Sequence, residues 1–539
     1  MKRSIQLLYL YWLRFWARLQ LGKNKDAVVV GITGSAGKGS TREALYAGIR
    51  DLKQVRMLDW GNSETGVALN ILGFGKPVYG WKYWLRVGLL APWQYLTFSP
   101  KYEVLIVEMG IDGPDWPKNM EYLLSVVQPD IGVFLNAGTV HGEMFDTLVA
   151  LQGKINSEEE YEAAIRRLIA EEKGRLVLGA KIGVVNGDDS NVMAVVDRGQ
   201  GELVRFGKEK ESAVRLVGVM NDLQDGFTAE FEVNRTLLAR HSDLPSRQVG
   251  EATTSGESYS DTERDASQML RAVQDDGLMG DDVSRYLLRF TDQLMTEAYG
   301  YNFAAVLGVG LSLNLLAHHS DLPNRQAGEA TTSGESYRDT ERDASQMLRV
   351  DSSTLADWQD EVTPEQIIQG IEQHLELPPS RMSLLAGING SMIVDASYNA
   401  SEDSMRDAVA MMDNLKVQGK KIGVFGDMRE IGDRTEVAHR ELMEEINPPA
   451  GGGVFDELVL VGPYFGAVKQ DEVWFERADE AAEYVRRVLS KGDVVLVKGS
   501  QNMIYLEYVV EQLLANEADK ENLCRRGEFW EKVKGEWFG

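Results

Sequence analysis

The chain has 539 residues, a formal net charge of −26 and a single cysteine, Cys524. This length exceeds one ordinary hydrophobic core, so we expect two or more domains. The negative charge argues against binding to nucleic acid, because phosphate backbones would be repelled. A lone cysteine allows neither an internal disulfide nor a thiolate zinc site, which favours a reducing, cytoplasmic location.

Residues 1–25 predict an amphipathic N-terminal helix. Leu7–Leu21 is rich in aromatic and apolar residues, and Arg14 and Arg18 lie one turn apart. The stretch is too short and too interrupted to span a bilayer, and it lacks the cleavage site of a secretory signal. Two interpretations remain open. The helix lies on the inner membrane surface as a peripheral contact, or it packs against the body of the protein.

Residues 27–43 read AVVVGITGSAGKGSTRE, which predicts a strand, a glycine-rich turn and the start of a helix. This is the arrangement of a phosphate-binding loop, in which backbone N–H groups and the helix N-terminus face phosphate oxygens. Lys38 supplies a charge for the β- and γ-phosphates, and Ser40 or Thr41 supplies a hydroxyl for Mg²⁺. The predicted nucleotide-binding residues of the loop are Gly34, Ser35, Ala36, Gly37, Lys38, Gly39, Ser40 and Thr41.

Predicted strands and helices then alternate along the chain, which indicates an α/β fold with mostly parallel sheets. The pattern is interrupted at LELPPSR, residues 375–381. We therefore predict a central P-loop parallel-sheet ATPase domain over 26–375 and a smaller, Rossmann-like C-terminal α/β domain over 376–539. The predicted strands after the first lie at 103–110, 131–138, 181–189, 391–397, 420–428, 457–462 and 493–500. The predicted helices lie at 41–52, 401–415 and 478–490.

The middle of the chain contains an internal repeat. Residues 241–271 and 319–349 are identical except at three positions, and both are polar and charged. Segments with so few large apolar residues cannot bury enough surface to order their backbone. We expect two disordered surface insertions, and we expect their histidines to be solvated and not to bind metal.

The motifs in this order resemble the Mur ligase family of ATP-dependent amide-forming enzymes. GITGSAGKGST is similar to the family's phosphate loop, VEMGIDGP to its acidic metal-binding strand, and LNAGTVHGEMFD to its asparagine–histidine segment. In the C-terminal half, RMSLL, DASYNASEDSM, FGDMREIG followed by His439, and LVKGS appear in the family's order. The YNA-x-x-D-S-M pattern points to the branch that adds D-alanyl-D-alanine to a muramoyl peptide, although Ser401 stands where proline is usual.

The resemblance implies a site for ATP and two Mg²⁺ ions. Ser40, Glu108 and His141 would be metal ligands. A lysine carbamylated by CO₂ would bridge the two ions, and Lys173 is the best match, with Lys154 the weaker candidate. Hard oxygen ligands suit Mg²⁺, and a carboxylate at the end of a buried strand is costly unless it is paired or bound to metal.

Other roles also follow from the resemblance. Arg381 would reach the γ-phosphate, and Lys498 would meet the acyl phosphate or the substrate carboxylate. Asp395 and Asn302 would contact the nucleotide, although the histidine–asparagine pair expected at Asn302 is not intact. The catalytic set is therefore Lys38, Lys173, His141, Arg381 and Lys498, and the substrate-binding set is Asn62, Tyr398 and Asn399.

Two departures from the family pattern leave alternatives open. About 25 residues precede the first predicted strand, whereas the ligases that the chain resembles carry a uridine-nucleotide domain there. The acceptor is therefore held in another way, supplied with a partner's help, or lipid-linked. Gly39 stands where threonine is usual and matches folylpolyglutamate synthetases. The expected activity is an amide ligase of peptidoglycan precursor synthesis acting on small molecules. The alternatives are a folylpolyglutamate-type ligase and a nucleotide-binding scaffold without catalysis.

Overall fold

We describe the fold from a computed structural model. It describes residues 2–76, 81–138, 142–151, 157–199, 201–239, 283–291, 293–321, 362–429, 431, 434–447, 452–500 and 504–538. The chain divides into two compact units, each described by itself. Unit 1 contains Met1–Gly218, Glu230–Leu287 and Tyr301–Leu375. Unit 2 contains Val219–Ala229, Leu288–Gly300 and Glu376–Gly539.

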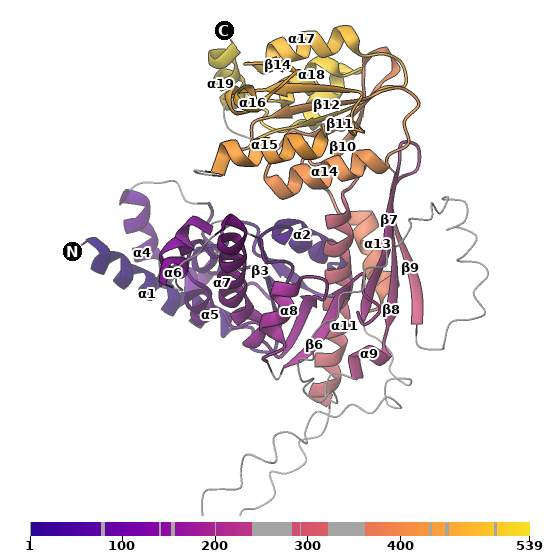
Figure 1. The fold of residues 1–539 in the computed structure, drawn as a ribbon. Helices are drawn as coiled ribbons and strands as arrows, with labels where there is room; N and C mark the ends of the chain where they lie inside the picture. Colours follow the sequence, from indigo (N-terminus) through magenta and orange to yellow (C-terminus); the bar gives the residue numbers. More distant parts are fainter. Residues whose placement is uncertain are drawn as a thin grey trace, which may run out of the picture. The chain divides into compact units, whose positions relative to one another are not determined.

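Unit 1 is built on a nine-stranded sheet in the order β2-β3-β1-β4-β5-β6-β7-β8-β9. Figure 1 labels β3, β6, β7, β8 and β9 of this sheet. The strands from β2 to β7 pair in parallel. The connection between β7 and β8 is only three residues long, so these two neighbours form a hairpin and the sheet is mixed. The strands are β1 (Val28–Thr33), β2 (Val55–Met57), β3 (Val104–Glu108), β4 (Ile131–Phe134), β5 (Ile182–Asn186), β6 (Glu202–Gly207), β7 (Val214–Asp222), β8 (Gly226–Asn234) and β9 (Val283–Phe290).

Strand β1 lies between β3 and β4, and this position sets where polar side chains meet. Ile32 of β1 is in register with Glu108, and Thr33 is in register with Phe134. The carboxyl ends of three neighbouring parallel strands therefore lie together, at the edge where open α/β sheets bind ligands. Because these strands are covered on both faces, they are almost entirely apolar.

Helices cover the unit 1 sheet. α1 packs with one side in the core beside α3, α4 and α5, and α7 packs on β4 and α8. The structure thus shows the N-terminal helix packed against unit 1. The helices are α1 (Lys2–Leu21), α2 (Lys38–Ile49), α3 (Gly66–Ile71), α4 (Trp81–Thr97), α5 (Met120–Val126), η1 (Gly142–Phe145), α6 (Asp146–Leu151), α7 (Glu158–Leu178), α8 (Ser190–Val196), α9 (Thr236–Ala239), α11 (Glu297–Asp321) and α13 (Pro364–His374).

Unit 2 is a six-stranded sheet in the order β10-β11-β15-β12-β13-β14, in which only the β10–β11 pair is antiparallel. Alternate residues of its strands enter two cores, one with α14 and α15 and the other with α17 and α18. Its elements are β10 (Ser383–Ala386), β11 (Met392–Ala396), α14 (Glu402–Asn414), β12 (Lys421–Gly426), α15 (Thr435–Ile446), β13 (Glu457–Val461), α16 (Pro463–Val468), β14 (Val473–Phe475), α17 (Ala478–Val488), β15 (Val494–Lys498), α18 (Glu507–Leu513) and α19 (Glu528–Phe538).

The predicted fold class is confirmed, with two differences of detail. Every strand and helix predicted above is present, with ends shifted by a few residues. The first difference is antiparallel pairing at β10, and the second is the β7–β8 hairpin. The chain passes from unit 1 to unit 2 at Leu375–Glu376, but 219–229 and 288–300, from the range predicted for the central domain, belong to unit 2.

Most of the repeat lies outside the described residues, namely all of 241–271 and 322–349. The second copy begins within a helix, because His319–Asp321 form the end of α11. Within the described residues, a single stretch, Glu297–Ala317 of α11, has the length and composition of a membrane span. Since 83% of that stretch is buried inside the protein, α11 also fits the description of a core helix.

Candidate active site

The loop after β1 is the centre of the candidate site in unit 1. Gly37 precedes α2 with φ of +81°, in the left-handed region, and a Cβ built there would lie 2.5 Å from Oδ1 of Asn302. Glycine is therefore required at 37, both for the turn and for the approach of Asn302. Lys38 Nζ donates to the carbonyl oxygen of Gly34 at 2.8 Å, so the amine lies over the loop.

Asn136, just beyond β4, holds the loop in place. Its Oδ1 accepts from the backbone N–H groups of Ser35 and Ala36, both at 2.9 Å, and its Nδ2 donates to the Ala36 carbonyl at 3.2 Å. One side chain thus makes three hydrogen bonds to two consecutive loop residues. The loop conformation is fixed by the protein's own groups.

Lys173 of α7 reaches the same loop, 138 residues away in sequence. Its side chain is only 4% exposed, and Nζ donates to Ser35 Oγ at 2.8 Å. Ser35 Oγ in turn donates to the Gly138 carbonyl at 3.0 Å. Burial holds the pKa of Lys173 well below its usual range, and the charge of Lys38 lowers the pKa further while Asp189 opposes both effects. Burial and the charge of Lys38 thus both disfavour the protonated form of Lys173.

Glu108 ends β3 beside the loop. Its Oε2 accepts from Arg42 at 3.2 Å and its Oε1 accepts from Asn62 Nδ2 at 3.0 Å. The carboxylate lies close to the start of α2, because a Cβ at Gly39 would be 3.9 Å from Oε2. Burial lowers the pKa of Lys38, while the negative charge of Glu108 raises it. Glu108 and Lys38 therefore belong to one electrostatic site.

Unit 2 gathers a second group of the predicted residues around the end of β15. Lys498 is buried and its Nζ donates to the Asn399 carbonyl at 3.0 Å. Burial lowers the pKa of Lys498 to about 8, with Asp407 opposing and Arg381 adding to the effect. The Arg381 guanidinium lies 4.7 Å from the centroid of the Tyr398 ring. Within the described residues, Nε of Arg381 is buried without a hydrogen-bond partner, which leaves a donor for an anion.

Asp395 is fully buried, and both of its carboxylate oxygens are occupied. Oδ2 accepts from Ser380 Oγ at 2.6 Å, and Oδ1 accepts from the backbone and side chain of Ser397 at 3.0 and 2.7 Å. Burial raises the pKa of Asp395, and these hydrogen bonds lower it in part. In this conformation Asp395 fixes the loop that begins at Ser397. Its contact with nucleotide stays a prediction.

With this geometry in view, two family models match the chain in sequence order. The Mur ligase middle domain matches residues 32–248, and the Mur ligase, glutamate ligase domain matches residues 380–501. Together they match more than half of the chain. The chain belongs to the Mur ligase family. Members of this family are ATP-dependent carboxylate–amine ligases.

The curated relatives are UDP-N-acetylmuramoyl-tripeptide–D-alanyl-D-alanine ligases. The protein from Bacillus subtilis is 33% identical over 159 residues, which cover 28% of this chain and 34% of the relative. The protein from Escherichia coli is 29% identical over 148 residues, which cover 26% of this chain and 31% of the relative. The chain spans about a third of the length of these relatives.

Solved Mur ligase structures share the fold. The MurF ligase from Thermotoga maritima in complex with ADP has a TM-score of 0.59 and 21% identity, covering 95% of this chain and 84% of that one. A MurF from Acinetobacter baumannii has a TM-score of 0.57 and 17% identity, covering 92% of this chain and 79% of that one.

Two predicted site residues of this Mur ligase, His141 and Lys154, lie outside the described residues. In the part of the chain that the structure describes, no three His, Cys, Asp or Glu residues are grouped so that they could hold a metal. The structure does bring Lys38, Glu108, Asn62, Lys173 and Asn302 together around the loop, and it brings Arg381, Tyr398, Asn399 and Lys498 together in unit 2. His439, part of the family motif, is buried and accepts from Met428 N at 3.0 Å, so it has a structural role.

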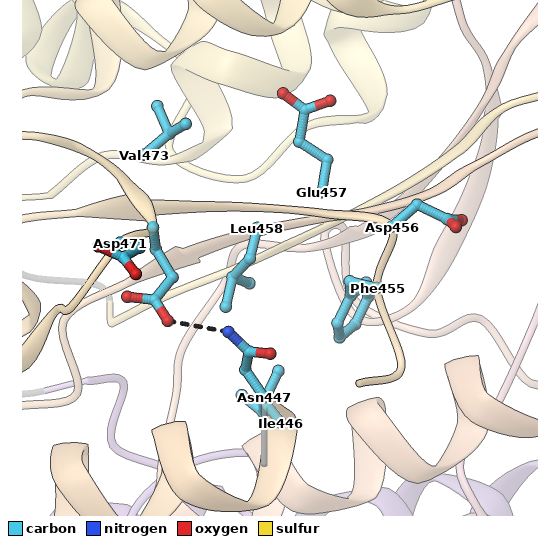
Figure 2. A pocket seen from close by; sticks show the side chains of 9 residues that line it. Ile446, Asn447, Phe455, Asp456, Glu457, Leu458, Asp471 and Val473 are labelled. Atoms are coloured by element: carbon cyan, nitrogen blue, oxygen red, sulfur yellow. Dashed lines mark hydrogen bonds between the residues drawn. The ribbon is translucent and has the colours of Figure 1, made fainter. Parts of the chain in front are cut away.

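A pocket of about 280 Å³ in unit 2 is lined by none of the predicted site residues (Figure 2). Two of its acidic lining residues, Glu472 and Asp456, already have partners. Glu472 accepts from Asn447 Nδ2 at 3.0 Å, the dashed line in Figure 2, and Asp456 accepts from the backbone of Lys421 at 2.8 Å. The pocket therefore adds nothing to the site of this Mur ligase.

Two positioning groups were not predicted as site residues. Asn136 lies within the segment identified by resemblance, but nothing in its spacing shows that it binds the loop. Arg525 pairs with buried Glu507 at 2.6 Å and donates to the carbonyls of Ser397 and Tyr398. The hydrogen bonds to Ser397 and Tyr398 join Arg525 to residues more than a hundred positions earlier, and no motif signals them.

Proposed function

We propose that this Mur ligase forms an amide bond in peptidoglycan precursor synthesis by adding D-alanyl-D-alanine to a muramoyl-peptide acceptor in the cytoplasm. The acceptor carboxylate attacks the γ-phosphorus of ATP, which releases ADP and gives an acyl phosphate. The amine of D-alanyl-D-alanine then attacks the acyl carbon, and phosphate leaves as the amide forms. The names of the curated relatives and the YNA-x-x-D-S-M segment support this choice of amine.

The residues around the loop fit the chemistry of phosphoryl transfer. Lys38 and the N-terminus of α2 stabilise negative charge on the phosphates. Ser40 and Glu108 are hard oxygen donors suited to Mg²⁺, and the Glu108 carboxylate lies beside the start of α2, where Ser40 is found. Bound Mg²⁺ would neutralise charge on the transferring phosphoryl group. Arg381 and Lys498 are proposed to contact the γ-phosphate and the acyl phosphate, and Asn302 and Asp395 the nucleotide.

The observation that carries the proposal is the buried Lys173 amine at Ser35. Carbamylation by CO₂ requires an unprotonated amine, and burial together with Lys38 disfavours the protonated form. As a carbamate, Lys173 would supply anionic oxygens at the loop in addition to the Glu108 carboxylate.

Phosphate release tests the function directly. The protein is incubated with ATP, Mg²⁺ and muramoyl-tripeptide acceptors, either uridine-nucleotide-linked or lipid-linked, each with D-alanyl-D-alanine or with glutamate. We expect phosphate release only when acceptor and D-alanyl-D-alanine are both present. Lys38→Ala should lower the rate at least about a hundredfold, since it removes charge stabilisation worth about 3 kcal/mol. Its unchanged unfolding temperature would show that the loss is chemical.

The same assay separates the alternatives. Turnover with glutamate on a folate or poly-glutamate acceptor, and none with muramoyl peptides, would replace the proposal with a folylpolyglutamate-type ligase, which Gly39 favours. ATP binding without turnover on any acceptor would identify a nucleotide-binding scaffold.

A further inference from the structure

The surface of α1 and α4 carries most of the large apolar side chains that the described part of the protein exposes. Among the described residues, fourteen large hydrophobic side chains are exposed, and nine of them lie on these two helices. On α4, Leu89 is 71% exposed and Trp93 is 62% exposed. We define the α1–α4 face as these nine residues: Leu8, Tyr11, Trp12, Phe15, Leu19, Leu85, Leu89, Trp93 and Leu96.

Each helix is apolar on two opposite sides. On α1, Leu10, Leu13 and Ala17 are buried in the unit 1 core, whereas Leu8, Trp12, Phe15 and Leu19 follow a spacing of four, three and four residues on the other side. On α4, Val87 and Ala91 enter the same core, and the exposed residues repeat at four, four and three. Packing against unit 1 therefore explains why one side of each helix is apolar, but not why the other side is.

The two helices form one continuous surface. Tyr9 donates to the Trp84 carbonyl at 3.0 Å, Trp12 donates to the Gly88 carbonyl at 3.0 Å, and the rings of Trp16 and Tyr95 are 5.5 Å apart. Because these contacting residues follow one another in the same order along both helices, α1 and α4 run side by side in the same direction. Both lie at one edge of unit 1 in Figure 1. Because their buried sides enter one core, their exposed sides point away from the protein together.

The charge of these helices is opposite to that of the whole chain. Asp and Glu make up 83 of the 539 residues, yet neither helix contains one. Their charged residues are all basic: Lys2, Arg3, Arg14 and Arg18 on α1, and Lys82 and Arg86 on α4. A second copy of the chain would bring two basic faces together, which is unfavourable. An anionic lipid surface complements both the charge and the apolar side chains.

We propose that the α1–α4 face binds the surface of an anionic lipid bilayer. Its leucines and phenylalanine enter the boundary between headgroups and acyl chains, and Trp12 and Trp93 lie at the interface that tryptophan prefers. Lys82 and Arg86, which are exposed on α4, lie near lipid phosphates. The membrane-binding surface thus includes α4 as well as the N-terminal helix. Its role does not depend on which amide the site forms.

Vesicle co-sedimentation of the full chain tests the proposal. The vesicles contain phosphatidylcholine alone or with about 30% phosphatidylglycerol, an anionic lipid. We expect binding to the anionic vesicles, with a blue shift of tryptophan fluorescence, and weaker binding at about 0.5 M NaCl. The variant Leu8→Gln/Phe15→Gln/Leu89→Gln/Trp93→Gln should bind at least tenfold more weakly. The control Leu178→Gln/Phe529→Gln changes exposed apolar residues elsewhere and should bind like the wild type.

Arg86→Glu provides a second variant that leaves the apolar face intact, and it should weaken binding to anionic vesicles several-fold. Unfolding temperatures of all variants establish that they fold. Failure of the wild type to bind either vesicle would overturn the proposal, as would equal binding by the wild type and the four-residue variant. A wild-type dimer that becomes monomeric in the four-residue variant, with no vesicle binding by either, would assign the face to self-association instead.

Discussion

At the scale of single residues, Lys173 and Lys498 are buried lysines whose pKa values are lowered mainly by loss of water. Lysine is costly to bury as an ammonium, so such positions usually serve chemistry. Lys173 faces the phosphate loop of unit 1, and Lys498 ends a strand in unit 2. The two lysines allow separate tests.

Lys173→Ala should lower ligation by on the order of a hundredfold or more, because a carbamate at 173 would stabilise charge in the transition state. Short carboxylic acids added to the assay should restore part of the activity, and removal of bicarbonate should lower the activity of the wild type. Lys181→Ala is the matched control, since Lys181 is exposed and pairs with Asp130 at 2.8 Å. Wild-type activity in Lys173→Ala would make Lys154 the next residue to test.

Lys498 should make stability depend on pH. Its folded pKa of about 8 is below the value of 10.5 for an unperturbed lysine, so the unfolded state binds more protons between these values. The wild type should therefore gain up to about 3 kcal/mol in unfolding free energy relative to Lys498→Met as pH rises from 8 to 10.5. Urea unfolding at several pH values measures the difference. A flat difference for Lys498→Met would contradict the burial argument.

At the scale of elements, the turn between β1 and α2 depends more on Gly37 than on Gly39. Gly37→Ala should destabilise the protein by about 1–2 kcal/mol, because the left-handed conformation disfavours a Cβ. It should also weaken ATP binding, because the new Cβ would displace Asn302. Thermal unfolding and binding of a fluorescent ATP analogue measure both effects.

Gly39→Ala is the control for this turn. Gly39 lacks a positive φ, and among the described residues outside its own helix the nearest atom to a Cβ there would be Glu108 Oε2, at 3.9 Å. We expect the stability of this variant to match the wild type. Equal losses in the two variants would show that the turn is sensitive to any side chain, and the specific role of Gly37 would be rejected.

The segment from β1 to α2 also shows why part of the site could be predicted from the sequence. The strand, glycine turn, lysine and helix are contiguous, so their geometry follows from local preferences. The end of β3 at Glu108 could be predicted from a buried apolar run. The hydrogen bonds of Asn136 to the loop, and those of Arg525 to the carbonyls of Ser397 and Tyr398, could not, because they join distant residues through tertiary packing. The antiparallel β10 and the β7–β8 hairpin are local, and they were missed because β7, β8 and β10 were not among the predicted strands.

At the scale of the whole molecule, the repeats should contribute little to stability. Deleting 241–271 and 322–349 together should leave the unfolding temperature and ATP binding nearly unchanged, because these polar segments offer little apolar surface to bury. The second deletion begins at 322 because His319–Asp321 belong to α11. A fall of many degrees in calorimetry would show that the repeats belong to the fold.

Unit 2 includes two segments that come before Glu376 in the sequence, and this limits how the protein can be divided into fragments. Leu294, completely buried, and Leu223 both pack in the core that contains Met405 and Phe425, and Gln293 bridges to Ser383. These residues belong to unit 2, although they follow β7 or β9 in the sequence and come well before Glu376. A fragment cut at 376 would expose the core that they cover. We therefore expect that the C-terminal ligase domain cannot be excised at Glu376 and that it folds together with these earlier segments.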